Sequence, residues 1–202
     1  MQPQGVMKYR KILIKLLTTV AALFVLVFLP VNALAHCDTM DGPVVKAAQR
    51  ALVTRNVNLV LIWVQKEDEP VISKRFQEVL AVRRLGGEAR NLADAYFFET
   101  VVRLHRAGEG EPYNGLRPAG TDVGPVIPVA DKAFKDGSVS ALLKLLPAAA
   151  AADIEAKFKE AIAKRSFNEN DVGAGREYVK AYVSFLHLVE HVYEEKSNGS
   201  TQ

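Results

Sequence analysis

The chain has 202 residues, of which 49% are hydrophobic and 24% charged, enough for one well-buried core. It carries 26 Lys and Arg against 23 Asp and Glu, but four of the cations lie within residues 1–35, so the rest is close to neutral. No basic stripe with interleaved aromatic residues remains, and we therefore exclude nucleic acid as a partner.

Residues 1–35 have the order of a secretory signal peptide. A cationic start precedes an apolar run over residues 16–29 and a small-x-small cleavage site at Ala33-Leu34-Ala35. The apolar run is short for a bilayer span, which favours cleavage over retention. We predict a secreted or periplasmic protein that begins at His36 and keeps no stable membrane span after cleavage.

The remaining residues, 36–202, are predicted to form a single all-α domain, a helical bundle built by internal duplication. When the chain is shifted by 82 residues, segment 42–105 aligns with segment 124–187 without a gap and agrees at 16 of 64 positions. Unrelated sequences agree at roughly one position in fifteen. We therefore predict two repeats, 42–123 and 124–202, each one helical unit.

Each repeat shows a pattern of successive helices. Pro43 and Pro125 suit the first turn of the leading helix in each repeat. Further helices are predicted over 57–64, 68–84 and 88–107 and, in the second repeat, near 139–146, 149–165 and 171–196. The run 57–64 is also β-branched enough for a strand, but its counterpart favours a helix.

Residues 108–123 are predicted to form a loop between the repeats. They hold four glycines and two prolines and show no periodicity. A loop of this length within a compact domain often carries function.

The histidines all follow residue 35. The repeat places His105 and His187 at equivalent points of equivalent helices, so their imidazoles are expected to face one another if the halves pack about a pseudo-twofold axis. The alternative is a pair of core histidines bonded to backbone or carboxylate groups. His187, Glu190 and His191 also spell H-x-x-E-H, the inverzincin protease signature. Only 11 residues follow, too few for that family's downstream acidic ligand, so Glu190 is predicted to lie on a solvated helix end.

The strongest chemical signal is the amino terminus that cleavage after Ala35 would create, His36-Cys37-Asp38-Thr39-Met40-Asp41-Gly42. An amino-terminal histidine offers its amine and its imidazole together. Cys37, the single cysteine, adds a backbone amide and a thiolate. Such N and S donors suit copper or nickel better than calcium or magnesium. We predict a copper or nickel ion bound by residues drawn from His36, Cys37, Asp41, His105, His187 and His191.

This segment resembles the hook of nickel superoxide dismutase, an exported helical-bundle enzyme whose mature chain starts H-C-D-x-x-C-G. His36, Cys37, Asp38 and Gly42 match that pattern. The resemblance implies that His36 supplies the amine and an axial imidazole, and Cys37 its amide nitrogen and thiolate. The hook's second cysteine falls at Asp41, which leaves open a copper or mixed N/O/S site. The opening H-C-D-T is also similar to an uncharacterised family of exported bacterial proteins.

Two alternatives concern the same residues. Leu34-Ala35-His36-Cys37 is similar to a lipobox, although histidine stands where processing needs a small residue, and acylation of Cys37 would remove the free histidine amine. The leading hypothesis is an exported metal-binding protein, with a superoxide dismutase-like redox role if copper or nickel is bound. The competing hypothesis is a non-catalytic helical binding module, or a metal carrier or sensor of the cell envelope. No catalytic residue is assigned, and a homo-oligomer is left open.

Overall fold

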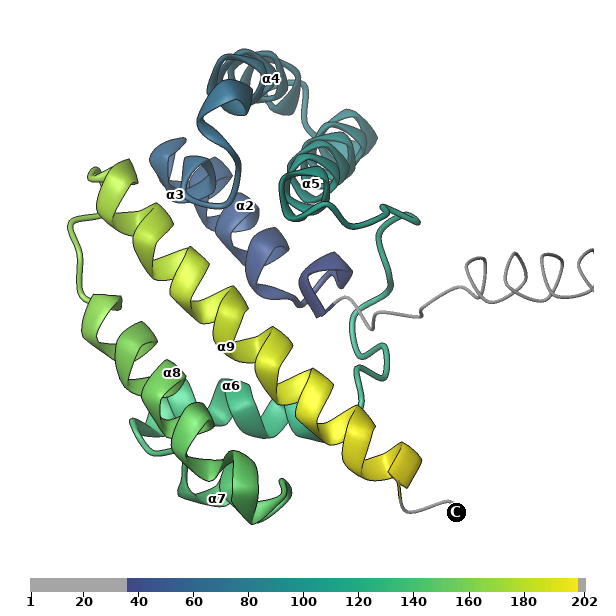
Figure 1. The fold of residues 1–202 in the computed structure, drawn as a ribbon. Coiled ribbons are helices and arrows are strands. Elements are labelled where there is room, and N and C mark those ends of the chain that lie inside the picture. Colours follow the sequence, from purple (N-terminus) through teal and green to yellow (C-terminus); the bar gives the residue numbers. More distant parts are fainter. Residues whose placement is uncertain (1–35, 200–202) are drawn as a thin grey trace, which may run out of the picture. The chain divides into compact units, whose positions relative to one another are not determined.

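A computed structural model describes residues 36–199, and the predicted signal peptide lies outside this range (Figure 1). Every regular element in the described range is a helix, which confirms the all-α prediction. No helix in this part of the chain is long and apolar enough to cross a membrane.

A first series of helices begins with η1, ahead of the first predicted repeat, and continues through that repeat. These are η1 (His36–Asp38), α2 (Pro43–Thr54), α3 (Asn58–Leu61), η2 (Lys66–Asp68), α4 (Glu69–Arg83) and α5 (Gly87–Glu109). Pro43 occupies the first turn of α2, as predicted, where its missing N–H would have no helical partner. Arg55 ends α2 in the left-handed region, with φ of 57°.

The second predicted repeat gives the same order of elements as α2 to α5. These are α6 (Val126–Asp136), α7 (Ser140–Leu143), η3 (Ala148–Ala150), α8 (Ala151–Lys164) and α9 (Val172–Gly199). The starts of α3 and α7, of η2 and η3, and of α4 and α8 each lie 82 residues apart. A duplication would produce this spacing; the duplication itself stays a prediction.

The predicted helix over 57–64 is shorter than expected, because α3 ends at Leu61. The carbonyl groups that follow accept hydrogen bonds from side chains of other helices instead of continuing the helical ladder. His105 Nδ1 lies 2.8 Å from the oxygen of Trp63, and Arg176 donates to the oxygens of Leu61 and Val64, both at 3.0 Å. This segment therefore joins α3 to α5 and α9.

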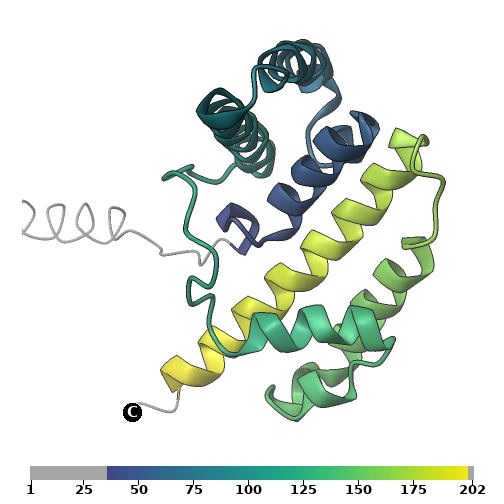
Figure 2. The ribbon, with the colours of Figure 1, turned by 180° about the vertical axis from the view of Figure 1, so that it is seen from behind.

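The long helix α9 lies between the two halves (Figures 1 and 2). It packs against α8 and α6 on one side and contacts α3 on the other, whereas α5 packs against α4 and α2. Phe134, Phe158 and Phe185 form the aromatic core of the second half, with ring centroids 5.3 to 5.7 Å apart. Phe76 and Phe97 pack at 5.6 Å in the first. These two cores hold α5 and α9, the helices that carry the conspicuous histidines.

Candidate functional site

The amino-terminal segment His36–Asp41 is enclosed by the loop between the repeats. Arg117 of that loop donates its N–H to the oxygen of Asp38 at 2.9 Å, and its oxygen accepts from the N–H of Met40 at 2.9 Å. Asp41 is exposed and accepts from the N–H of Gly120 at 3.1 Å. The loop is thus fixed to the predicted hook by a short parallel bridge and by the Asp41 carboxylate.

Gly42 lets the segment turn back sharply on itself. A Cβ at this position would lie 2.3 Å from the oxygen of His36 and 3.0 Å from the oxygen of Thr39. The φ of Gly42 is −73°, so the position requires glycine because the backbone approaches closely and not because of an unusual dihedral angle. Thr39 closes the turn by donating its hydroxyl to the oxygen of His36 at 3.1 Å.

The His36 imidazole is held by a residue of the second repeat. Its Nε2 lies 2.9 Å from Oδ2 of Asp131, and the hydroxyl of Tyr182 donates to Oδ1 of the same carboxylate at 2.8 Å. Burial raises the pKa of Asp131, but the hydrogen bond and electrostatic attraction to His36, together with the hydrogen bond from Tyr182, outweigh it and bring that pKa below its ordinary value. Because Nε2 donates to a carboxylate, a neutral imidazole in this position carries its lone pair on Nδ1. That atom is buried and has no hydrogen-bond partner within the described residues.

Cys37, within the same segment, is a free and buried thiol. Burial raises its pKa well above the ordinary value, and the negative charges of Glu109 and Asp38 raise it further. The positive charge of Arg106 opposes them. Without an additional cation, the sulfur is therefore protonated and unreactive at neutral pH.

Arg106 is a buried cation among carboxylates that the sequence interpretation did not identify. Its guanidinium lies 3.6 Å from Asp38, 3.3 Å from Glu109 and 3.6 Å from Glu111. Burial raises the pKa of Asp38 to about 6, although Arg106 and Arg117 lower it. The i, i+3 spacing of Arg106 and Glu109 beside His105 was the only sequence signal for this network.

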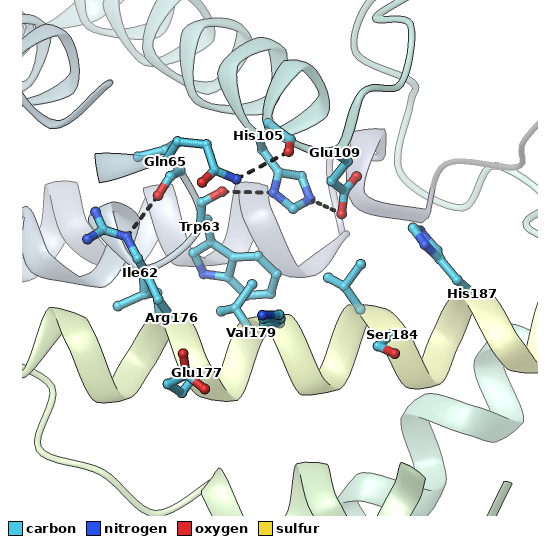
Figure 3. Close-up of a pocket in the computed structure, with 14 residues that line it drawn as sticks. Ile62, Trp63, Gln65, His105, Glu109, Arg176, Glu177, Val179, Ser184 and His187 are labelled. Carbon is cyan, nitrogen blue, oxygen red and sulfur yellow. Dashed lines mark hydrogen bonds and ion pairs between the residues drawn. The ribbon is translucent and has the colours of Figure 1, made fainter. Parts of the chain in front are cut away.

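His105 occupies the wall of a cavity of about 680 Å³ between α5, α9 and residues 62–65 (Figure 3). Its Nδ1 lies 2.8 Å from the oxygen of Trp63, and its Nε2 lies 3.4 Å from Oε1 of Glu109. Burial lowers the pKa of His105 to about 4, so the ring is neutral at physiological pH. His187 lies on the opposite wall, on α9.

The structure separates the predicted ligands into three locations. His36 and Cys37 lie together in η1. His105 and His187 line one cavity but differ in burial, since His105 is 3% exposed and His187 is exposed. His191 is exposed, with its Nε2 3.3 Å from Glu195. Within residues 36–199, no three His, Cys, Asp or Glu side chains converge as a metal-binding group.

Glu190 was expected on a solvated helix end, and this expectation is wrong. The residue is half-buried, and burial raises its pKa to about 7, with the neighbouring Glu194 adding to the shift. The charges of His36 and Arg106 act in the opposite direction. Glu190 therefore belongs to the surroundings of the amino-terminal segment.

Comparison with known proteins assigns the helical domain to a family. Residues 41–188 match the family described as "Family of unknown function (DUF6448)". The chain belongs to this family. The matched range includes His105 and His187, whereas the segment His36–Met40 precedes it. No curated protein and no solved structure matches the chain.

Proposed function

We propose that the protein is an exported metal-binding protein whose mature amino terminus chelates a copper or nickel ion through the α-amine and Nδ1 of His36. The observation that carries this proposal is the buried Nδ1, which has no hydrogen-bond partner in the described chain while Nε2 is fixed by Asp131. A metal-bound histidine typically donates its other ring N–H to a carboxylate or carbonyl. Asp131, itself held by Tyr182, supplies that carboxylate.

Cleavage before His36 would add the second donor. The amine and Nδ1 of an amino-terminal histidine belong to one residue and can close a small chelate ring on one ion. Such a site does not need three ligating side chains, because the α-amine nitrogen of His36 takes the place of one side-chain ligand. The proposal therefore depends on processing at Ala35-His36, a bond that lies at the edge of the described residues.

Cys37 supports a soft or borderline cation as the occupant. Its thiol is buried beside Glu109 and Asp38, whose negative charges outweigh the positive charge of Arg106, so a bound metal cation would stabilise the thiolate. Copper and nickel bind thiolate and imidazole well, whereas calcium and magnesium prefer oxygen. The carboxylate of Asp41 accepts a hydrogen bond from Gly120. This contact favours a role for Asp41 in holding the loop rather than in binding the metal.

The direct test is export of the full chain followed by sequencing of its amino terminus and metal analysis. We expect a mature protein that starts at His36 and holds about one copper or nickel ion per chain. His36→Ala should abolish tight binding. Asp131→Asn should weaken it by about 10- to 100-fold, the usual loss when the partner of a ligating histidine is removed. His191→Ala is the matched control and should bind normally.

The proposal fails if the mature chain starts elsewhere, if Cys37 is acylated, or if His36→Ala retains its copper or nickel. A redox role of the superoxide dismutase type is the enzymatic form of the proposal, and a metal carrier or sensor is the non-catalytic form. Superoxide consumption by the loaded protein, compared with the His36→Ala variant, separates the two forms. Equal rates from both proteins would favour the carrier or sensor.

A further inference from the structure

An arginine-lined groove lies where the end of α2 meets the turn between α4 and α5. The groove has a volume of about 330 Å³, and Leu52 and Leu80 form part of its lining. The other lining residues are Val53 and four arginines, which come from the end of α2 (Arg55), the end of α4 (Arg83 and Arg84) and the first turn of α5 (Arg90). Three helices thus bring arginines to one place.

The positive charge of this groove is largely uncompensated. Arg83 forms an ion pair with Asp94, whereas the other three arginines are exposed and form none within the described chain. Segments 51–58 and 79–93 together hold the four arginines and one acidic residue, Glu88. Three guanidinium groups therefore lack a carboxylate partner, and an anion from outside would relieve their mutual repulsion.

Exposed apolar side chains flank the arginines. Val53 is 74% exposed and Leu85, next to Arg84, is 77% exposed. Leu85 precedes the turn Gly86-Gly87, and a Cβ at either glycine would meet no atom within 4 Å, so this turn stands clear of its surroundings. Cations beside exposed aliphatic side chains are typical of surfaces that bind at the boundary between lipid headgroups and acyl chains.

We propose that this groove attaches the protein to an anionic phospholipid surface. Guanidinium groups bind phosphate oxygens through paired N–H donors, and each arginine near an anionic leaflet adds to the attraction. Val53 and Leu85 enter the boundary of the acyl chains beside the headgroups. The attachment thus combines phosphate recognition by the arginines with a small apolar contact.

Two other occupants fit the groove less well. A second copy of the chain related by a twofold axis would place arginines opposite arginines, which like-charge repulsion opposes. A stable protein partner covers about 800 Å² on each side, around an apolar core enriched in aromatic residues. Val53 and Leu85 offer little of such a core, whereas a lipid surface needs no matching shape.

The groove lies at the opposite end of α2 from the amino-terminal segment. The helix begins beside that segment at Pro43 and ends at Thr54, next to the groove (Figure 1). Its 12 residues span about 18 Å. Attachment through the groove therefore does not require the metal site proposed at His36 and does not need to cover it.

The test measures flotation of the exported protein with vesicles of phosphatidylcholine that contain about one third phosphatidylglycerol, at about 0.1 M salt. We expect binding that vesicles of phosphatidylcholine alone do not give. Replacing the three unpaired arginines together (Arg55→Gln, Arg84→Gln and Arg90→Gln) should weaken binding about 100-fold, because one arginine contributes about fivefold. Leu85→Gln should weaken it about fivefold by removing the apolar contact.

The matched control replaces three exposed cations from other parts of the domain that also form no ion pair in the described chain, Arg103→Gln, Lys144→Gln and Lys180→Gln. This triple control makes the same change in net charge and should alter binding by less than about twofold, since charges distant from the lipid are screened. Any attachment through residues 1–35 would be shared by all variants, so the difference between the two triple variants isolates the groove. Circular dichroism of each variant checks that its fold is intact.

The proposal is overturned if the protein does not bind the anionic vesicles, or if the groove variant binds them as well as the unmodified protein does. Displacement by millimolar inorganic phosphate, without any effect of Leu85→Gln, would assign the groove to free phosphate and overturn it too. A dimer that dissociates in the groove variant would assign the groove to a second copy, and stronger binding of polyglutamate than of vesicles would assign it to an acidic polypeptide; either result overturns the proposal. Loss of vesicle binding with unchanged copper or nickel content would support a lipid site separate from His36, and absence of metal from every variant would contradict the proposed function alone.

Discussion

Replacing Gly42 with alanine tests whether the close turn at the amino terminus is required. The new Cβ would lie 2.3 Å from the oxygen of His36, about 1 Å short of an ordinary contact of 3.4 Å. The turn must therefore shift by about 1 Å, and a shift of that size away from Asp131 lengthens the 2.9 Å bond from His36 beyond hydrogen-bonding distance. Forcing an extra methyl group into a packed site costs about 1–3 kcal/mol.

For a domain of this size, that cost lowers Tm by about 2–12 °C. Urea unfolding followed by circular dichroism gives the free energy of unfolding, and copper uptake by the protein reports on the proposed His36 chelate. Gly173→Ala is the control, because its Cβ would meet only Oδ1 of Asp171 at 3.4 Å near the start of α9. Alanine there should be neutral or slightly stabilising. If Gly42→Ala unfolds at the same urea concentration as Gly173→Ala, the reasoning about this turn is wrong.

Three further substitutions test the surroundings of the segment. Burial raises the pKa of Glu190 to about 7, so the folded state is stabilised when this carboxyl is protonated. That stabilisation is complete below pH 4.5, the pKa in the unfolded chain, and is lost as pH rises through 7. Glu190→Gln should thus stabilise the metal-free protein by about 1–2 kcal/mol at pH 8, allowing for its partial exposure, with little effect near pH 4; an equal effect at both pH values in urea unfolding would contradict this. Arg106→Met leaves buried carboxylates without their cation and should destabilise the protein by about 3–5 kcal/mol in the same assay at pH 7; a change below 1 kcal/mol would show that the network is unimportant. Tyr182→Phe removes the hydroxyl bound to Asp131 and should cost about 1 kcal/mol by thermal unfolding, together with a several-fold loss of copper affinity; unchanged affinity would mean that Asp131 needs no second support.

Helix positions were largely predictable because they depend on local sequence. Proline starts, glycine breaks and apolar spacing located α2, α4, α5, α6, α8 and α9 to within a few residues. The early ends of α3 and α7, each three residues before the predicted end, were not foreseen. After α3, the carbonyl groups of Trp63 and Val64 lie within hydrogen-bonding distance of His105 and Arg176 on distant helices. Neither contact leaves a trace in the pattern of residues 57–64.

Only part of the candidate site could be predicted from the sequence. His36 and Cys37 are conspicuous as residue types, but their partners Asp131 and Arg106 are ordinary surface-like residues in the sequence until the fold brings them together. The predicted repeat also suggested that His105 and His187 have equivalent surroundings, and this is wrong. His105 bonds the carbonyl of Trp63, whereas the equivalent carbonyl, that of Leu145, accepts from Lys196, so His187 is left at the surface.

The bond between His36 and Asp131 makes the amino terminus depend on residues made much later. A polypeptide ending at residue 123 would contain the whole first helical unit and yet lack the carboxylate and the phenol that orient the imidazole. Such a half-length chain could orient its first residue only by borrowing these groups from a neighbouring molecule. In the intact chain, His36 acquires its final orientation only when α6 and α9, which carry Asp131 and Tyr182, have docked.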